Sequence, residues 1–181
     1  MTHQGLCATL RLMKLRTYPD PVLLKRSETV ENFDEELREK VAQMWDLMYD
    51  KGGVGLAAAQ VGWSVQLLLM NPSGSREDRD AERVVVNPKV IKSWGKEKSE
   101  EGCLSFPDIT VDVTRKKGLR LAWQDEHGKQ YEEDINDFPA RVIQHEIDHL
   151  EGVLLVHRMS PVDRIRYRRE LEEMLASGTT G

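Results

Sequence analysis

The chain has 181 residues, of which 39% are apolar and 31% charged, and its formal net charge is −5. This is the composition of a globular protein: the longest apolar stretches are only strand-sized, which excludes a membrane span, and the negative charge argues against a broad nucleic-acid footprint. Two cysteines are too few for a disulfide framework and fit a reducing compartment such as the cytoplasm.

Residues 1–12 lack the features of a targeting segment. They have no basic region followed by an apolar core, as in a secretory signal, and no amphipathic pattern rich in Arg and Ser, as in a transit peptide. Sequence typical of a folded protein begins directly after Met13. We therefore expect residues 1–12 to be a disordered leader, with Met13 as an alternative start, and residues 13–181 to form one domain. Cys7 lies in the leader, and no role is predicted for it.

The first predicted helix follows an apparent capping signal. Asn32 with Glu35 three residues later has the pattern of a capping box, and apolar residues then recur at helical spacing. The pattern predicts a helix of about four turns that ends before Gly52. The small, glycine-rich residues 53–60 follow it.

Strand patterns fill the middle of the chain, separated by a polar loop at residues 73–82. One apolar run is interrupted by an Asn-Pro pair, which predicts a bend, and two later segments flank the turn sequence DEHG at residues 125–128, which predicts a hairpin. The predicted strands are residues 65–70, 84–91, 109–113, 119–123 and 131–135.

Two further helices complete the predicted fold. Asp137, with Pro139 in the first turn, begins a helix that runs to about Glu151 and ends at Gly152. Ser160 precedes a last helix. The predicted class is α+β: short antiparallel β-sheets packed around a central helix, with an N-terminal and a C-terminal helix.

The central helix carries a metal-binding pattern. His145 and His149 are four residues apart, so their imidazoles lie on one face and suit two ligands of one divalent ion. Glu146 projects beside the first ligand, where it can reach a metal-bound water without coordinating the metal. Phe138 and Val142 lie on the histidine side of a helix that is apolar on both sides, so these polar groups would be buried and need a partner. The pattern predicts a metal-dependent hydrolase.

A catalytic metal needs a third protein ligand. Leu155 stands where the long metzincin motif has its third histidine, and His157, two residues further on, is interpreted as structural in a strand or turn. Glu170 has a thermolysin-like spacing but belongs to a segment that reads as a solvated, charged helix face. Cys103 is the better candidate, because a thiolate is a strong ligand for a borderline metal.

Three separate motifs resemble the signature motifs of the peptide deformylase family, in the order in which that family has them. They are GVGLAAAQ at residues 53–60, EGCLS at residues 101–105 and QHEIDHL at residues 144–150. The resemblance extends over about residues 13–175, and residues 18–23 and Arg115 also fit it. It implies removal of the N-formyl group from the initiator methionine of nascent polypeptides, with release of formate.

The same resemblance implies roles for individual residues. The implied metal ligands are Cys103, His145 and His149. With water in the fourth position, Glu146 would take the proton of that water and pass it to the leaving amine. The side-chain amide of Gln60 and the backbone N–H of Leu104 would stabilise the negative charge that develops on the formyl oxygen.

The resemblance says less about the residues of the substrate cleft than about the metal site. Gly55 and Gly102 would line the cleft, since their missing side chains let the substrate backbone pair as an added strand. The wall of the pocket for the methionine side chain is predicted to include Val54, Phe138 and Val142. The segment that starts with Phe138 varies within the family, so the resemblance leaves the details of substrate recognition there open.

The sequence also leads to expectations about the identity of the metal and of the binding partners. Ligand softness and tetrahedral geometry by themselves suggest zinc, whereas the resemblance implies Fe²⁺ in the cell, with Zn²⁺, Ni²⁺ or Co²⁺ able to substitute. The expected partners are N-formylmethionyl ends of nascent chains. A transient ribosome contact is left open, because residues 161–175 hold four arginines against four acids. We expect a cytoplasmic monomer with no direct nucleic-acid readout and no membrane partner.

Two other functions compete with this interpretation. A zinc metallopeptidase would cleave unformylated peptides and use a ligand other than Cys103. A non-catalytic nascent-chain or ribosome-binding module would hold a structural metal in a closed, four-ligand site. Glu146 and Gln60 argue against such a module, because a structural site needs neither.

Overall fold

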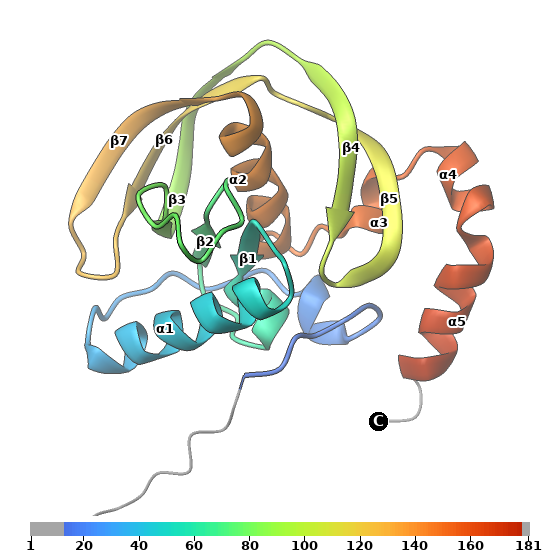
Figure 1. The fold of residues 1–181 in the computed structure, drawn as a ribbon, viewed down its shortest axis with the longest axis horizontal. Helices are drawn as coiled ribbons and strands as arrows, with labels where there is room; N and C mark the ends of the chain where they lie inside the picture. The colour runs from blue at the N-terminus through green and yellow to red at the C-terminus, as the bar shows by residue number, and fades with distance from the viewer. Residues whose placement is uncertain (1–12, 179–181) are drawn as a thin grey trace, which may run out of the picture.

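The computed structural model describes residues 13–178 (Figure 1). The predictions made for residues 1–12, including Cys7, lie outside these described residues. A five-stranded antiparallel sheet has the order β1-β2-β3-β6-β7, and β4 and β5 form a separate antiparallel hairpin. The strands are β1 (Gly55–Ala57), β2 (Leu67–Met70), β3 (Arg83–Trp94), β4 (Glu97–Cys103), β5 (Phe106–Arg115), β6 (Gly118–Gln124) and β7 (Gln130–Asn136).

Helices cover both faces of the five-stranded sheet. The α-helices are α1 (Glu35–Asp50), α2 (Asp137–Leu150), α3 (Leu155–Arg158), α4 (Pro161–Arg166) and α5 (Arg168–Gly178), and two short 3-10 helices are η1 (Pro21–Leu24) and η2 (Ala58–Val61). Strand β2 is buried on both faces: Leu67 and Leu69 belong to the core under α1, and Leu68 and Met70 to the core under α2. This explains why β2 has an uninterrupted apolar sequence. The α+β class with a central helix is confirmed.

The predicted start of α1 was wrong by two residues. Asp34, not Asn32, is the N-cap: its carboxylate accepts a hydrogen bond of 3.0 Å from the backbone N–H of Leu37. A carboxylate both satisfies a free N–H and complements the positive end of the helix dipole, so it is the stronger cap. The helix ends at Asp50, as expected, and Gly52 follows with a φ of +67°.

The predicted strands are present, and the bend in β3 is confirmed at Asn87. This residue has a φ of +52°, and the pairing of β3 with β6 shifts register there. The hairpin between β6 and β7 is also confirmed. Strand β4 was not predicted, because its sequence EKSEEGC is polar and largely exposed and has no alternation of apolar residues.

Long strands carry the chain over α2. Figure 1 shows β3 continuing into β4, and β5 into β6, as two arches above that helix. From Ile109 onward, buried and exposed residues alternate along β5. The buried ones pack with residues of the segment after α2 in a third core cluster, which includes Ile109, Val111, Val113, Leu154 and Leu155. Helix α2 therefore lies between the five-stranded sheet and the β4–β5 hairpin.

The last predicted helix is two helices. Ser160 caps α4 as expected, but the chain turns at Tyr167, whose hydroxyl donates a 2.8 Å hydrogen bond to the carbonyl of Thr110 on β5. This tertiary anchor explains a break that helical periodicity does not reveal. Helix α5 is charged and exposed, with ion pairs such as Arg168–Glu172. Within residues 13–178, no helix combines the length and apolarity needed to cross a bilayer.

Candidate metal centre

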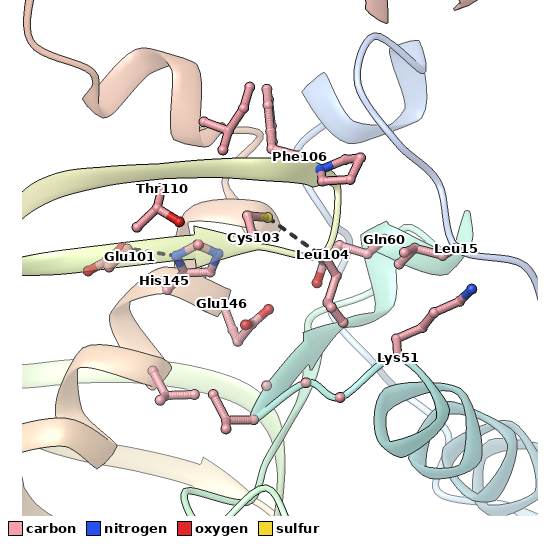
Figure 2. Close-up of a pocket in the computed structure, with 18 of the residues that line it drawn as sticks. Leu15, Lys51, Gln60, Glu101, Cys103, Leu104, Phe106, Thr110, His145 and Glu146 are labelled. Carbon is pink, nitrogen blue, oxygen red and sulfur yellow. Dashed lines mark hydrogen bonds and ion pairs between the residues drawn. The ribbon is translucent and has the colours of Figure 1, made fainter. Parts of the chain in front are cut away.

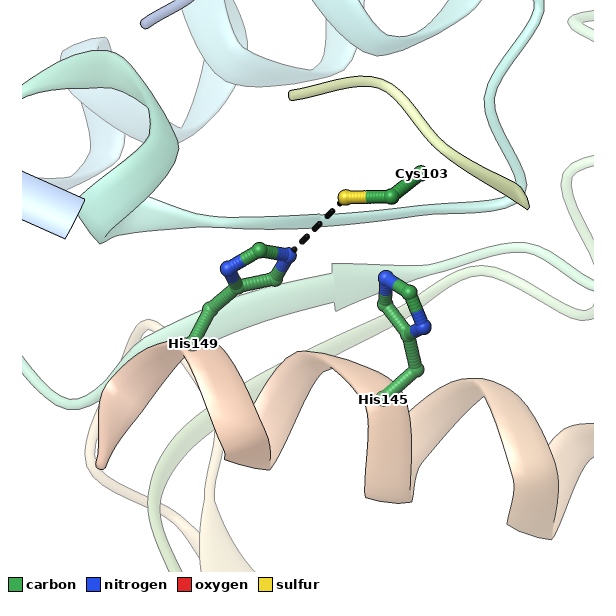
Figure 3. A group of neighbouring side chains, drawn as sticks. All are labelled: Cys103, His145 and His149. Carbon is green, nitrogen blue, oxygen red and sulfur yellow. Dashed lines mark hydrogen bonds between the residues drawn. The ribbon is translucent and has the colours of Figure 1, made fainter. Parts of the chain in front are cut away.

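Helix α2 presents the predicted histidines as the sequence pattern requires. It contains Pro139 in its first turn and is followed by Gly152, whose φ is +72° and where a Cβ would lie 2.5 Å from the carbonyl oxygen of Leu24. Only glycine fits this turn. Figure 3 shows His145 and His149 on consecutive turns, both directed toward Cys103. The two imidazoles and the thiol therefore converge on one point.

The third member of the group comes from the hairpin. Cys103 is the last residue of β4 and precedes the two-residue turn of Leu104 and Ser105. One ligand atom from each of Cys103, His145 and His149 lies within 4.8 Å of the other two, and the Cys103 Sγ is 3.2 Å from the His149 Nε2. Among the described residues this is the one group with such an arrangement of ligand atoms.

The donor set fits a divalent metal. One sulfur and two imidazole nitrogens are the ligands that borderline ions such as zinc and ferrous iron accept, and three protein ligands leave one coordination position open. His149 is 1% exposed, and burial lowers its pKa well below the ordinary value, so it is held in the neutral form that ligation needs. Its Nδ1 has no hydrogen-bond partner within residues 13–178.

His145 is oriented by a carboxylate behind it. Its Nδ1 lies 3.0 Å from the Glu101 Oε2, which leaves Nε2 for the metal side. Burial by itself raises the pKa of Glu101, but hydrogen bonds from His145 and Arg115 outweigh it and lower that pKa to about 2. Glu101 is therefore ionised at neutral pH, and a carboxylate is the usual partner of a metal-ligating histidine.

Glu146 follows His145 on α2, and its carboxylate lies close to Gly55 of β1. The residue is 4% exposed, and its Oε2 is buried without a hydrogen-bond partner in the described part of the chain. Burial raises the pKa of Glu146 to about 7. A carboxyl group with a pKa near neutrality can both accept and return a proton, which is the requirement for general acid–base catalysis.

Gln60 belongs to η2 and is almost completely buried. Its Oε1 accepts a 2.9 Å hydrogen bond from the backbone N–H of Ala57, and its Nε2 donates a 3.1 Å hydrogen bond to the Ser105 Oγ. The same Nε2 lies 3.8 Å from the Cys103 Sγ. The amide is therefore fixed with its N–H group toward the metal-binding residues.

Most of these residues border one cavity of about 720 Å³ (Figure 2). It is large enough for several residues of an extended peptide. The cavity lining includes every residue that was predicted to contact substrate. These are Val54, Gly55, Gly102, Phe138 and Val142. Gln60, Leu104, Cys103, His145 and Glu146 line the same cavity, whereas His149 does not belong to its wall.

Four other residues that the sequence offers as ligand candidates lie outside the metal-binding group. His157 is in helix α3 rather than a strand or turn, and its Nδ1 accepts a hydrogen bond from the N–H of Leu154, so it serves as a helix cap. Glu170, Glu172 and Glu173 are on α5 and do not belong to the ligand group. The structure thus gives no support to a thermolysin-like third ligand.

Sequence reasoning missed a buried ionic cluster behind the histidines. Arg115 donates to both Glu101 oxygens at 2.9 Å and to the Asp148 Oδ2 at 2.6 Å, and Arg141 donates to the Glu101 Oε1 at 2.7 Å. The sequence held two signals: Arg115 fits the family resemblance, and charged residues occur on the buried central helix.

The fold and site together define a class of enzyme. A buried helix supplies two histidines and a glutamate, a strand end supplies a thiol, and these groups lie at the wall of a peptide-sized cavity. This is the arrangement of a metal-dependent hydrolase.

Comparisons with known proteins identify the family. A sequence model of the polypeptide deformylase family matches residues 12–165. The peptide deformylase of Chlorobaculum parvum is 41% identical over 162 residues, which cover 89% of this chain and 87% of that protein. For the peptide deformylase of Thermotoga maritima the identity is 39% over 164 residues, covering 90% and 96%.

The structural comparison agrees. The crystal structure of peptide deformylase from Plasmodium falciparum superposes with a TM-score of 0.88 at 36% sequence identity, covering 91% of this chain and 96% of that one. The chain belongs to the polypeptide deformylase family, whose members are metal-dependent hydrolases that remove the N-formyl group from nascent polypeptides.

Proposed function

We propose that Cys103, His145 and His149 would hold the divalent metal needed for deformylation and that Glu146 is the proton-transfer group. One observation carries this assignment. The buried Glu146 Oε2 has no hydrogen-bond partner within the described residues, and Glu146 lines the same cavity as Cys103 and His145. An unpaired buried carboxylate oxygen is costly, so its retention points to a partner in the catalytic cycle.

The chemistry divides between the metal and the chain. A divalent metal bound by these ligands would lower the pKa of a water molecule and so supply a nucleophile near neutral pH. Glu146 accepts a proton from the attacking water and then delivers it to the nitrogen of the leaving methionine. The C–N bond of the formyl amide breaks, and formate and a free amine result. One carboxylate thus acts first as base and then as acid.

Gln60 and Leu104 stabilise the charge on the formyl oxygen. The Gln60 amide is pre-oriented by its hydrogen bonds to Ala57 and Ser105, so no reorganisation is needed during the reaction. Leu104 is the first residue of the hairpin turn, outside the paired residues of β4 and β5, where its N–H is available to a ligand. Each such donor is worth about a hundred- to a thousandfold in rate in other enzymes.

The substrate lies between β1 and the end of β4. At Gly102 a Cβ would meet protein atoms no closer than 3.8 Å, so the space above this residue is open to a substrate backbone. The methionine side chain enters the cavity beside Val54, Phe138 and Val142. Phe138 is 49% exposed, as expected for a side chain that a substrate covers.

Gly55 keeps Glu146 in place, and a substitution there should separate catalysis from metal binding. In Gly55→Ala the new Cβ would lie 2.6 Å from the Glu146 Oε1 and 2.8 Å from the Val142 Cγ1, so the carboxylate must move. We expect kcat to fall by about ten- to a hundredfold, because displacements of this size misalign reacting groups. Metal content, measured by mass spectrometry, should stay at the wild-type level.

Gly102→Ala provides the contrast to this variant. Because its Cβ clashes with nothing in the free protein, it should raise KM rather than lower kcat. A wild-type kcat in Gly55→Ala would mean that the position of Glu146 does not limit the reaction.

We further propose Fe²⁺ as the metal in the cell, with Zn²⁺, Ni²⁺ or Co²⁺ as substitutes, and a monomeric enzyme of the cytoplasm that acts on formyl-methionyl chain ends during transient ribosome contact. Residues 13–181 would form the catalytic domain. Plant relatives are named chloroplastic, so the compartment varies among the matched proteins.

Formate release from formyl-Met-Ala-Ser tests the proposed function. Protein prepared without oxygen and loaded with Fe²⁺ should release formate faster than the Zn²⁺ form, and unformylated Met-Ala-Ser should remain intact. Absence of formate with every metal would contradict the deformylase assignment. Cleavage of the unformylated peptide would instead support the metallopeptidase.

A further inference from the structure

The ionic cluster behind the metal centre contains an arginine that joins two elements. Arg141 is on α2, and its guanidinium reaches the β4–β5 hairpin. Nη1 donates to the Glu101 Oε1 at 2.7 Å and to the carbonyl of Val113 at 2.9 Å, and Nη2 donates to the carbonyl of Glu97 at 2.9 Å. Its side chain is 6% exposed. One buried side chain thus binds both strands of the hairpin to the helix.

The metal ligands lie on the same two elements. His145 follows Arg141 by one turn on α2, and Cys103 follows Glu101 by two residues on β4. The distance between the histidines and the thiol therefore depends on how the hairpin is seated on α2. Arg141 fixes that seating close to the ligands.

The two oxygens of Glu101 have different partners. Oε1 accepts hydrogen bonds from Arg141 and from the Nε of Arg115, and Oε2 faces the Arg115 Nη2 and the His145 Nδ1. Without Arg141, Oε1 would keep one donor, and the carboxylate could rotate away from the histidine. The orientation of the imidazole would then be less well defined.

We propose that Arg141 is a positioning residue for the metal centre: it seats the β4–β5 hairpin on α2 and holds Glu101 in the orientation that directs His145. The inference rests on the ligand set given under the proposed function. Only arginine suits the position, since its planar fork meets a carboxylate and two carbonyls on different strands at once, whereas the ammonium of lysine is a single point.

Metal affinity tests this role independently of activity. In Arg141→Met, we expect the dissociation constants for Zn²⁺ and Co²⁺ to rise by about tenfold or more, as for other partners behind metal ligands. The thiolate-to-Co²⁺ absorption band should shift, because the ligand geometry relaxes. At saturating metal, kcat should recover to within a few-fold of wild type, because all three ligands remain.

The matched control is Arg120→Met. It removes another arginine that pairs with a carboxylate across strands, since Arg120 contacts Asp134 at 2.7 and 2.9 Å, but on the exposed face of β6 and β7. The control should bind metal as the wild type does. An Arg141→Met affinity equal to that of the control would overturn the proposal.

Arg141→Lys keeps the test decisive if the methionine variant does not fold. We expect its metal affinity to lie between those of wild type and Arg141→Met, and a wild-type affinity in folded Arg141→Lys would also overturn the proposal. In Glu101→Gln, a further Arg141→Met should cost less metal affinity than it does in the wild type, because only its contacts with the Val113 and Glu97 carbonyls remain to be lost. Full additivity of the two losses would mean that Arg141 does not act through Glu101.

Failure of this inference differs from failure of the ligand set. If Cys103→Ala retains the metal, the ligand assignment is wrong. If Cys103→Ala loses the metal but Arg141→Met binds it normally, only the role of Arg141 is wrong.

Discussion

Glu146→Gln is expected to lower kcat for formate release by about a thousandfold, the middle of the range for loss of a general acid–base. The amide has nearly the shape of the carboxylate but can neither accept the proton of the water nor return it to the amine. Because burial makes a charge at this position costly, the neutral substitute should not lower the melting temperature.

The measurement is single-substrate kinetics on formyl-Met-Ala-Ser, with metal content determined on the same sample. Glu151→Gln is the matched control: this carboxylate lies at the end of the same helix but is exposed and pairs with Arg26, so its loss should leave kcat unchanged. Full activity of Glu146→Gln with bound metal would remove Glu146 from the mechanism.

Cys103→Ala should abolish activity by a different route, through loss of the metal. The two histidines that remain on α2 cannot by themselves hold a divalent ion against a chelator, because tight protein sites use three or more protein ligands. After dialysis against a chelator, we expect the variant to keep a small fraction of the wild-type metal content, with kcat below detection. The fold should persist, because Cys103 is partly exposed at a hairpin end.

Cys7→Ala is the control, since it removes the other thiol of the chain and should change neither metal content nor rate. A Cys103→Ala protein that retained its metal would show that another residue completes the site. That result would revive the metallopeptidase with Glu170, although Glu170 lies on α5 and does not belong to the group of convergent ligand atoms.

Local patterns predicted most of the fold, and tertiary contacts account for the errors. The alternation in β5 and the histidine spacing on α2 were readable because one residue type repeats with the period of one element. Strand β4 was not readable, since it is a polar strand that owes its existence to pairing with β5. The turn at Tyr167 depends on a hydrogen bond to Thr110, far away in the sequence.

In the candidate site, too, local patterns predicted some features and tertiary contacts determined the others. The chemistry of Cys103, His145 and Glu146 follows from their residue types and from the family motifs. Their convergence, and the orientation of Gln60 by Ala57 and Ser105, required the three-dimensional structure. The contact of Arg141 with Glu101 joins a helix to a strand 40 residues earlier, and no local pattern indicates it.

The position of the third ligand at the tip of a hairpin has a thermodynamic consequence. With two ligands on α2 and one on β4, a bound ion is a cross-link between two structural layers. By linkage, it stabilises only those states in which the layers are in contact. Local opening of the hairpin and release of the ion are then thermodynamically linked. The free ion concentration therefore determines how often the hairpin opens.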